Sequence, residues 1–540
     1  MAASPNEICK RLETLKTLRL RHEGIWRDCF DHSFTIRGSG LQHQDQLSAQ
    51  QAMDRKARIV DGTATDAGRI LASALQSGMT PANARWFELA MLGEDDATDR
   101  WLDEAAEILH QEIHNANFDA VGFESQLDMV AAGWFAMYID VDRERGGLHF
   151  EAWPISQVYA SATRAGGTID TVYRHYEITA AQAVREFGSA VSDQVQKRAD
   201  NEPDKTVEMV HAIYPRSLAL VGSQMSRNMP IASCHVEVQT KHLVRESGYA
   251  ELPVVVPRWS LIPNSAYAIG PMFDVLPDVR MLNEFKRLDY ASADIAISGM
   301  WIAEDDGVLN PRTIKVGARK VIVANSVDSM KPLLSGANWQ LATDRITGLQ
   351  AAIRKGLMAD QLQPQDQGPV ETATAIHARI ALLRQQLGPL FGRMQAEYLQ
   401  GLIERTFGLA FRAGIFGPPP QALADGGSFH IRYISPLARS QKLEDVSAIQ
   451  QLNASLLPVV QMGHGDVLDT IDFDAQAEAI AEALGVPKNT MRSVDDIKAI
   501  RDARAKQQAE AAQQAHQQEI QTLAAKEQFS AAGQRAVKAA

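Results

Sequence analysis

The longest helical signal in the chain places the strongest limit on how it can fold. Between residues 376 and 394 the apolar side chains recur in alternating steps of four and three, at Ile376, Ile380, Leu383, Leu387, Leu390 and Met394. This heptad-like spacing is typical of a helix that packs along one face. The signal continues less strictly to Gly414, and an unbroken helix would span on the order of 60 Å at ~1.5 Å per residue. The Gly388-Pro389 pair predicts a kink within it.

A polar segment directly before this helix separates it from another helical signal. Glutamine occupies alternate positions there: Gln361, Gln363, Gln365 and Gln367. Pro364 and Pro369 exclude a regular helix in this segment. The charges on either side, Arg354, Lys355 and Arg379, have a simple first interpretation as solvated helix charges. The segment is therefore predicted to be a loop between two helices, with no catalytic chemistry of its own.

The first half of the chain alternates between helix and strand periodicities, which predicts an α+β fold. Residues 100–118 and 123–135 have helical spacing, and residues 136–154 predict a hairpin with Gly146-Gly147 at its turn. A short helix is expected between Thr179 as N-cap and Gly188 as the stop. In the stretch "DGTATDAG", Thr65 or Asp66 is expected to cap the next helix.

Two more helices are predicted around a strand-containing insert. Residues 272–298 predict a helix kinked at Pro277, with apolar residues every three positions, which indicates several neighbours. Strand pieces follow within 301–334, and residues 338–360 predict a second helix with an apolar face at Ile346, Leu349, Ile353 and Leu357. Residues 501–540, rich in Ala, Gln and charge, predict an exposed or self-associating helix, or a tail that orders only in an assembly.

Composition excludes several classes of protein. The 540 residues carry a formal net charge of −12, which disfavours tight, wrap-around DNA binding but not loose, sliding contact. No apolar run approaches the ~18 residues of a membrane span, and the first residues lack the apolar core of a signal peptide. The three cysteines, Cys9, Cys29 and Cys234, are far apart and form no disulfide framework. Synthesis in a reducing cell interior is expected.

Two short patterns resemble metal sites, and both have a simpler interpretation. His110 and His114 are four apart on one helix face, but Gln111 stands where a zinc protease needs glutamate. Acidic residues occupy calcium-loop positions 1, 3, 5 and 12, at Asp140, Asp142, Glu144 and Glu151. Arg145, however, replaces the required glycine, and the flanks alternate like strands. A solvated helix surface and a charged hairpin tip are therefore favoured.

The chain also lacks phosphate-loop, dinucleotide and nucleophile-elbow motifs. We predict no catalytic residue, no metal and no cofactor, and a structural or assembly role. The alternative is a metal-dependent hydrolase that uses His110, His114 and the acidic hairpin.

Five segments, taken in order, carry a family resemblance. They are "LASALQSGMTPANARWFEL", "VPRWSLIPNSAYAIGP", "LPDVRMLNEFKR", "ETATAIHARIALLRQQLGPLFGRMQAEYLQGLIERTFGLAFRAG" and "IRYISPLARSQKLEDVSAIQ". Together they resemble the portal proteins of short-tailed (podovirus-type) bacteriophages, also called head-to-tail connecting proteins. The resemblance extends over roughly residues 71–504.

The resemblance implies a portal-type α+β ring subunit with a two-helix stem, a strand-containing clip, a long kinked wing helix and a C-terminal helical crown or barrel. The expected parts are an N-terminal wing at 1–270, stem helix 1 at 271–298, the clip at 299–337, stem helix 2 at 338–360, a tunnel loop at 361–372, the long helix and C-terminal wing at 373–500, and a crown or barrel helix at 501–540.

The family resemblance also implies a function without bond chemistry. The expected assembly is a homo-oligomeric ring, typically of twelve, at one capsid vertex of the virion, made in the host bacterial cytoplasm. Double-stranded DNA would enter and leave through its channel. The expected partners are the terminase large subunit, a tail adaptor, and the major capsid and scaffolding proteins, with no membrane.

Nine residues are candidates for contact with the moving DNA. The loop glutamines Gln361, Gln363, Gln365 and Gln367 would form a constriction, because amides bond phosphate transiently without strong salt-dependent binding. Basic residues of the two stem helices would offset a charge of roughly −140 per twelve-fold ring. These are Arg280, Lys286, Arg287, Arg354 and Lys355.

Overall fold

The computed structural model describes most of the chain as two compact units. The described residues are 4–41, 49–91, 96–142, 144–217, 219, 225–298, 300–303, 330–333, 339–362, 388, 390–424, 429–433, 446–456, 458, 470–484, 492 and 497–510. The first unit comprises Met1–Glu88, Ala105–Pro418 and Ile431–Ser440, and the second comprises Leu89–Glu104, Pro419–His430 and Gln441–Ala540. Helices and strands occur together, which confirms the α+β prediction.

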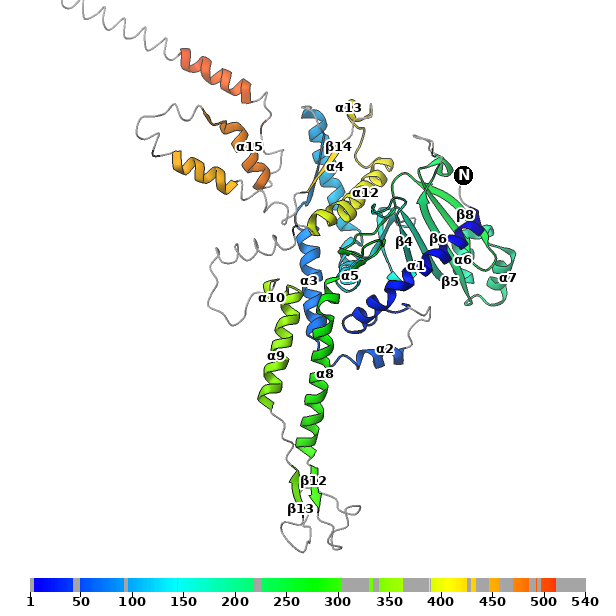
Figure 1. Cartoon of the computed structure of the whole chain (residues 1–540). Coiled ribbons are helices and arrows are strands. Elements are labelled where there is room, and N and C mark those ends of the chain that lie inside the picture. The colour runs from blue at the N-terminus through cyan, green and yellow to red at the C-terminus, as the bar shows by residue number, and fades with distance from the viewer. Residues whose placement is uncertain are drawn as a thin grey trace, which may run out of the picture. The chain divides into compact units, whose positions relative to one another are not determined.

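A five-stranded antiparallel sheet is covered by helices on both faces. Its strands pair in chain order: β4 (Val158–Ser161), β5 (Thr171–Thr179), β6 (Thr206–Pro215), β7 (Ile231–Glu237) and β8 (His242–Tyr249). Helix α1 (Pro5–Asp31) lies along one face and buries Ile8, Leu12 and Leu15 against it (Figure 1). Helices α6 (Ala180–Phe187) and α7 (Asp193–Asn201) contribute to the core on the other face. The sheet's apolar side chains are therefore covered within one chain.

The ends of α6 follow the sequence prediction. The Thr179 side chain accepts a hydrogen bond from the Gln182 backbone nitrogen in a capping box, and Gly188 ends the helix with a φ of 63°. A positive φ at the stop position costs glycine little because it has no Cβ. Local sequence therefore determines both ends of this helix.

One face of the sheet carries a row of four basic or imidazole side chains. Arg174, His211, His235 and Arg245 stand opposite one another on β5 to β8. The His211 and His235 rings are stacked with their centroids 3.9 Å apart. Burial, together with the neighbouring His235, lowers the pKa of His211 well below the usual histidine value. Folding therefore favours the neutral form of His211.

A second sheet packs with helices and an aromatic cluster. It contains β2 (Ala136–Val141), β3 (Leu148–Trp153) and β9 (Val254–Val255), in the order β3-β2-β9. The β2–β3 turn has positive φ at Gly146 and Gly147, which confirms the predicted hairpin. Nearby, the rings of Trp26, Trp134 and Tyr267 lie with centroids 5.2 to 5.3 Å apart. Trp26 Nε1 also donates to the Ala268 carbonyl at 3.0 Å, so this side chain links α1 to the segment before α8.

Several further helices and strands belong to the described residues. They are α2 (Ala49–Lys56), α3 (Thr63–Met79), β1 (Phe87–Met91), α4 (Asp96–Asn115), α5 (Phe118–Ala132), β10 (Ser260–Leu261), β11 (Ala268–Ile269), α13 (Gln421–Ala424), β14 (Phe429–Tyr433), α15 (Phe473–Leu484) and the 3-10 turns Ile155–Gln157, Gly188–Ala190 and Ser226–Asn228. Residues 446–456 and 497–510 are also helical. Within the described ranges, every helix is too short or too polar to cross a bilayer.

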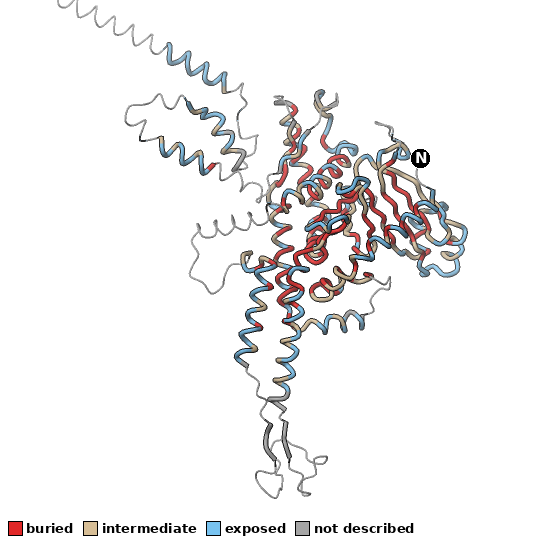
Figure 2. The backbone as a smooth tube through the Cα atoms, in the orientation of Figure 1, coloured by how far each residue is buried: buried red, intermediate tan, exposed pale blue. Residues whose placement is uncertain are grey.

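Two long helices project side by side from the first unit. Helix α8 (Pro271–Ser298) and helix α9 (Trp339–Gly356) pack together, and the antiparallel strands β12 (Met300–Ala303) and β13 (Met330–Leu333) continue beyond them (Figure 1). Pro277 lies within α8, which remains one helix. Both helices are buried where they join the core and increasingly exposed farther out (Figure 2). The predicted helix pair is thus present, and strands occur at both ends of the predicted insert. The strand pieces expected at 312–316 and 319–325 lie outside the described residues.

The predicted long helix is described only in its second part. Residues 376–387 lie outside the described residues, as do the residues 511–540 of the predicted C-terminal helix. From residue 390 the chain is helical, with a π-helical turn at Gln395–Leu399 that leads into α12 (Gln400–Arg412). Within this turn, Glu397 accepts two hydrogen bonds from Arg258 at 2.6 and 3.0 Å. The turn therefore directs a buried carboxylate at its arginine partner.

Candidate functional site

A polar cluster at the start of α3 holds α8 and α9 together. Asn283 Oδ1 on α8 accepts hydrogen bonds from the backbone nitrogens of Val60 and Asp61 at 2.8 and 3.0 Å. Gln350 Nε2 on α9 donates to Asp61 Oδ2 at 2.8 Å. Asp61 therefore contacts both helices where they leave the core, and it fixes the base of the pair.

The electrostatic surroundings of Asp61 favour its charged form. Burial alone would raise the pKa of this carboxyl group, but hydrogen bonds from Thr63 and Gln350 and the nearby Lys286 charge lower it below the usual aspartate value. A carboxylate that accepts several hydrogen bonds resists protonation. Asp61 is thus an ionised, buried anchor at neutral pH.

The sequence prediction for the start of α3 was wrong, and this anchor explains why. The helix begins at Thr63 with Gly62 as N-cap, and neither Thr65 nor Asp66 caps it. Instead, Asp61 Oδ1 accepts from the Thr63 backbone nitrogen at 2.8 Å, and the Thr65 hydroxyl donates to the Ser33 carbonyl at 3.0 Å. An aspartate two residues before a helix is a recognisable turn signal, but its partners on α8 and α9 are not visible in the local sequence.

The predicted stem cations have different surroundings. Arg280 forms an ion pair with Asp28 at 2.8 Å, and Arg287 with Glu284 at 2.9 Å. Lys286 lies near Asp61, as described above. Arg354 and Lys355 are exposed on α9, and within the described part of the chain no acidic side chain pairs with either of them. These two cations are therefore the best placed of the five to meet an external anion.

The glutamine segment is described only at its first residue. Gln361 belongs to the short helix α10 (Ala359–Leu362), which follows the left-handed residue Met358 with a φ of 57°. Its backbone nitrogen donates to the Met358 carbonyl at 3.1 Å, and its Oε1 is shielded from solvent. The loop prediction, which began at Gln361, was therefore wrong at Gln361 and Leu362, because both belong to α10. Gln363, Gln365 and Gln367 lie outside the described residues.

Comparison with known protein families identifies the family of the chain. The family model "Bacteriophage head to tail connecting protein" matches residues 5–491. The chain belongs to this family. The resemblance inferred from five sequence segments is thereby confirmed.

Two curated relatives of this connector are similar over nearly their whole length. The chain is 28% identical over 514 residues to the "Probable portal protein" of Bordetella phage BPP-1, which covers 92% of this chain and 90% of the relative. It is also 28% identical over 525 residues to the "Portal protein" of Salmonella phage epsilon15, covering 93% of this chain and 91% of the relative. Portal proteins are structural virion components without enzymatic activity.

Solved structures that align with the chain come from gene transfer agent particles. A chain from the "Virion of native gene transfer agent (GTA) particle" aligns with a TM-score of 0.36 and 12% identity, over 73% of this chain and 87% of that chain. A chain from the "Neck of empty GTA particle computed with C6 symmetry" aligns with a TM-score of 0.33 and 13% identity, over 70% and 85%.

In this connector the paired histidines are structural. The His110 and His114 rings are 4.6 Å apart, which matches the predicted common helix face. Trp86 Nε1 donates to His114 Nε2 at 3.3 Å, and His114 Nδ1 contacts Asp119 Oδ1 at 2.9 Å. Because Nε2 accepts, Nδ1 carries the proton, and His114 has no free lone pair for a metal. Burial and the neighbouring His114 lower the pKa of His110, so both rings serve packing.

The acidic hairpin of the connector also has internal partners. Asp142 Oδ1 accepts from the backbone nitrogens of Glu144 and Arg145 at 2.8 and 3.0 Å. Asp140 accepts from Tyr138, and Glu151 pairs with Arg174 at 2.9 Å. No group of three potential ligands occurs among the described residues. The hydrolase alternative therefore has no supporting geometry.

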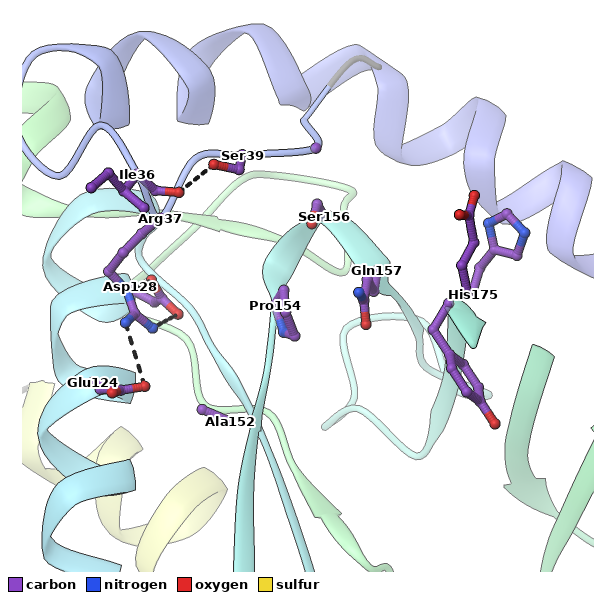
Figure 3. A pocket seen from close by; sticks show the side chains of 13 residues that line it. Ile36, Arg37, Ser39, Glu124, Asp128, Ala152, Pro154, Ser156, Gln157 and His175 are labelled. Atoms are coloured by element: carbon purple, nitrogen blue, oxygen red, sulfur yellow. Dashed lines mark hydrogen bonds and ion pairs between the residues drawn. The ribbon is translucent and has the colours of Figure 1, made fainter. Parts of the chain in front are cut away.

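A cavity of about 430 Å³ lies beside the end of α1, and three of its charged lining residues form an ion-pair network (Figure 3). Arg37 forms two hydrogen bonds to Asp128, at 2.6 and 2.8 Å, and a contact to Glu124 at 3.6 Å. A guanidinium that is held in this way neutralises the carboxylate beside it. The charges of Arg37, Asp128 and Glu124 at this cavity are therefore balanced within the fold.

Proposed function

We propose that this connector forms a closed ring, with twelve copies, through which double-stranded DNA enters the capsid and later leaves it. The observation that carries the proposal is the projecting α8–α9 pair in a chain of the head-to-tail connecting family. At ~1.5 Å per residue, the 28 residues of α8 extend roughly 42 Å, long enough to form a channel wall. In this proposal residues 1–270 are the wing, and α8 and α9 are the stem.

The charge of the chain favours weak contact with DNA that slides through the channel over tight DNA binding. Each copy carries a formal net charge of −12, so a ring repels phosphates at a distance. Arg354 and Lys355 are exposed without an acidic partner among the described residues, and in a ring they would form narrow bands of positive charge. Few phosphate contacts give weak, salt-sensitive binding, as sliding requires.

The glutamine segment is the proposed constriction of this channel. It follows α9 and α10 directly, so it begins where the stem meets the core. Neutral amides exchange hydrogen bonds with phosphate without retaining it. Of its four glutamines, Gln363, Gln365 and Gln367 carry the hypothesis, because Gln361 lies within α10 and its Oε1 is shielded from solvent.

The far end of the helix pair is the proposed docking surface for other proteins. Residues 299–337, which include β12 and β13, form the clip, where the terminase large subunit and then a tail adaptor would bind. The capsid and scaffolding proteins would contact the wing and the C-terminal residues 501–540. Synthesis occurs in the host bacterial cytoplasm before incorporation into the virion.

Imaging and native mass of the purified chain test the ring. We expect rings of roughly twelve times 59.3 kDa. A chain that stays monomeric at every concentration would refute the proposal. Replacing Gln363, Gln365 and Gln367 by alanine tests the constriction separately, through packaging and DNA retention. Unchanged packaging and retention in rings of normal size would remove the glutamines from the mechanism.

A further inference from the structure

The outward face of α8 carries a stripe of exposed apolar side chains. Phe273, Pro277, Met281 and Leu288 follow steps of four and seven, which place them on one side of the helix. Phe273, Met281 and Leu288 are 36%, 52% and 56% exposed. The opposite side of α8 buries Met272, Val275, Val279 and Leu282 in the core. Glu284 lies on the same side between Met281 and Leu288 and pairs with Arg287 at 2.9 Å. The exposed apolar residues on either side of it leave a packing surface unfilled.

The outward face of α9 has a complementary shape. Ile346, Ile353 and Leu357 are its buried positions. Directly opposite them lie Leu341, Asp344, Gly348, Ala351, Ala352 and Lys355, all exposed. Leu341 is 56% exposed, and a Cβ added at Gly348 would meet no atom within 4 Å. Small residues leave a shallow surface on which larger side chains of another helix can pack closely.

The two faces match level by level along the helix pair. Two contacts fix the register of the helix pair. Gly356 approaches Val275, and Gln350 and Asn283 both form hydrogen bonds with residues 60–61. The two helices are therefore antiparallel, and residue numbers decrease along α9 in the direction in which they increase along α8. This register puts Met281 at the level of Ala351 and Ala352. Leu288 falls between the levels of Leu341 and Gly348. Copies that are related by rotation about a ring axis parallel to α8 and α9 have corresponding residues at the same height along that axis. The outward face of α8 on one copy can therefore meet the outward face of α9 on the next copy at matching heights.

The charges on the two helices are complementary as well. Helix α8 has five acidic and three basic residues, which gives −2. Helix α9 has one acidic and three basic residues, which gives +2. Lys355 lies at the level of Pro277, between Asp274 and Asp278 of α8. Opposite charges at matched positions favour one register between two surfaces.

We propose that the outward stripe of α8 packs against the outward face of α9 on the neighbouring copy. Met281 would insert over Ala351 and Ala352, and Leu288 would pack beside Leu341. The inference rests on the proposed ring and names the surface that closes it. Two different surfaces that meet head to tail generate a ring when the rotation closes.

This contact changes the expected role of one stem cation. Lys355 would face the acidic residues of the next copy instead of the channel. Arg354, one residue earlier and about 100° around the helix, would remain directed away from that contact. Of Arg354 and Lys355, Arg354 alone would then be available to DNA.

Disulfide trapping across copies tests the contact. The variant Met281→Cys/Ala352→Cys should yield a ladder of covalent oligomers on a non-reducing gel, because disulfides need Cα atoms within about 7 Å. The two single variants control for the native cysteines. The mismatched pair Met281→Cys/Thr343→Cys displaces the second thiol by about 13 Å along α9 and should give no ladder.

The outcomes separate this contact from the ring itself. Rings in native mass spectra without a ladder from the matched pair would overturn the contact and leave the ring standing. An equal ladder from the mismatched pair would also overturn it. A chain that never forms rings would refute the proposed function and this inference together.

A charge placed in the stripe gives an independent readout. Met281→Glu should reduce the fraction of chain in rings at least tenfold, while the thermal unfolding of the free chain is unchanged because Met281 is exposed. The matched control is Leu20→Glu on α1, where the native leucine is 61% exposed. Ring fractions that respond equally to both substitutions would contradict the α8 stripe.

Discussion

The five-stranded sheet and the α8–α9 pair differ in where their apolar side chains go. On the sheet, apolar side chains are covered from both faces, by α1 on one and by α6 and α7 on the other. On the helix pair, Met281, Leu288 and Leu341 remain exposed. The sheet therefore obtains its stability inside one chain. The helix pair obtains its anchor from Asp61 and presents an apolar surface that the described parts of the same chain leave exposed.

Helix α8 shows both situations within one element. Its first half buries Val275, Val279 and Leu282, whereas Leu288 and Tyr290 in its second half are exposed. Substitutions near the core should therefore affect unfolding of the single chain. Substitutions on the projecting helices should affect assembly or DNA passage without changing that unfolding.

The largest effect on the single chain should come from Trp26→Ala. This buried indole contacts Trp134 and Tyr267 and donates to Ala268, so its loss leaves a cavity and an unpaired carbonyl. We expect a loss of about 3–5 kcal/mol in the free energy of urea unfolding. The control Leu20→Ala removes an exposed side chain of the same helix and should stay within about 0.5 kcal/mol. Similar losses from both would show that the core is not where we place it.

A smaller effect is expected at the junction, from Asp61→Asn. The charged carboxylate accepts hydrogen bonds from Thr63 and Gln350, and weakening them should cost about 1.5–3 kcal/mol of unfolding free energy at pH 7. Because the folded-state pKa of Asp61 is lowered, its contribution is full at neutral pH and disappears as pH falls through that pKa.

The difference between Asp61→Asn and the unmodified chain should therefore shrink toward pH 3 in parallel urea titrations. Asp66→Asn is the matched control, since Asp66 is exposed on α3, which Asp61 directly precedes, and makes only a weak ion-pair contact of 4.0 Å to Arg69. A difference that is constant with pH would exclude an ionised anchor.

The row of Arg174, His211, His235 and Arg245 on the five-stranded sheet predicts a third effect on the free energy of unfolding, which is seen only at acidic pH. The pKa of His211 is lowered on folding, so the unfolded chain binds its proton first as pH falls below about 6.5. Unfolding free energy should then fall by about 1.4 kcal/mol per pH unit for this group. His211→Gln should reduce that slope between pH 7.5 and 5.5, whereas substitution of the exposed His149 should not. Equal slopes in all three chains would remove His211 as the cause.

The smallest effect on stability should come from Arg354→Gln. Arg354 is exposed on α9, and surface substitutions of this kind stay within about 0.5 kcal/mol. DNA packaging and retention should nevertheless change, because this side chain is proposed to meet phosphate. Arg185→Gln on α6 removes an arginine that is 85% exposed and serves as the control. Identical packaging by both variants would argue against a DNA contact at Arg354.

Local patterns predicted many elements of this fold but not the contacts between them. The capping box at Thr179, the Gly146-Gly147 turn and the helices α8 and α9 depend on neighbouring residues, so their signals are present in short windows. The junction is different, because Asp61 and Gln350 are 289 positions apart in the chain. The outward stripe was also missed, since three-residue spacing in α8 indicates several neighbours without showing which side is left open.

The separation between Asp61 and Gln350 has a consequence for the order of events during translation. At ~5–20 residues per second, the ribosome needs about 15–60 s to reach Gln350 after it has added Asp61. During that interval the N-terminal helices can pack, but the aspartate lacks its final hydrogen bond. The base of α8 and α9 is thus completed only after the projecting helices and the strands between them have been synthesised. In the proposed ring, subunit association would therefore follow the synthesis of about two thirds of the chain, since Gln350 is residue 350 of 540.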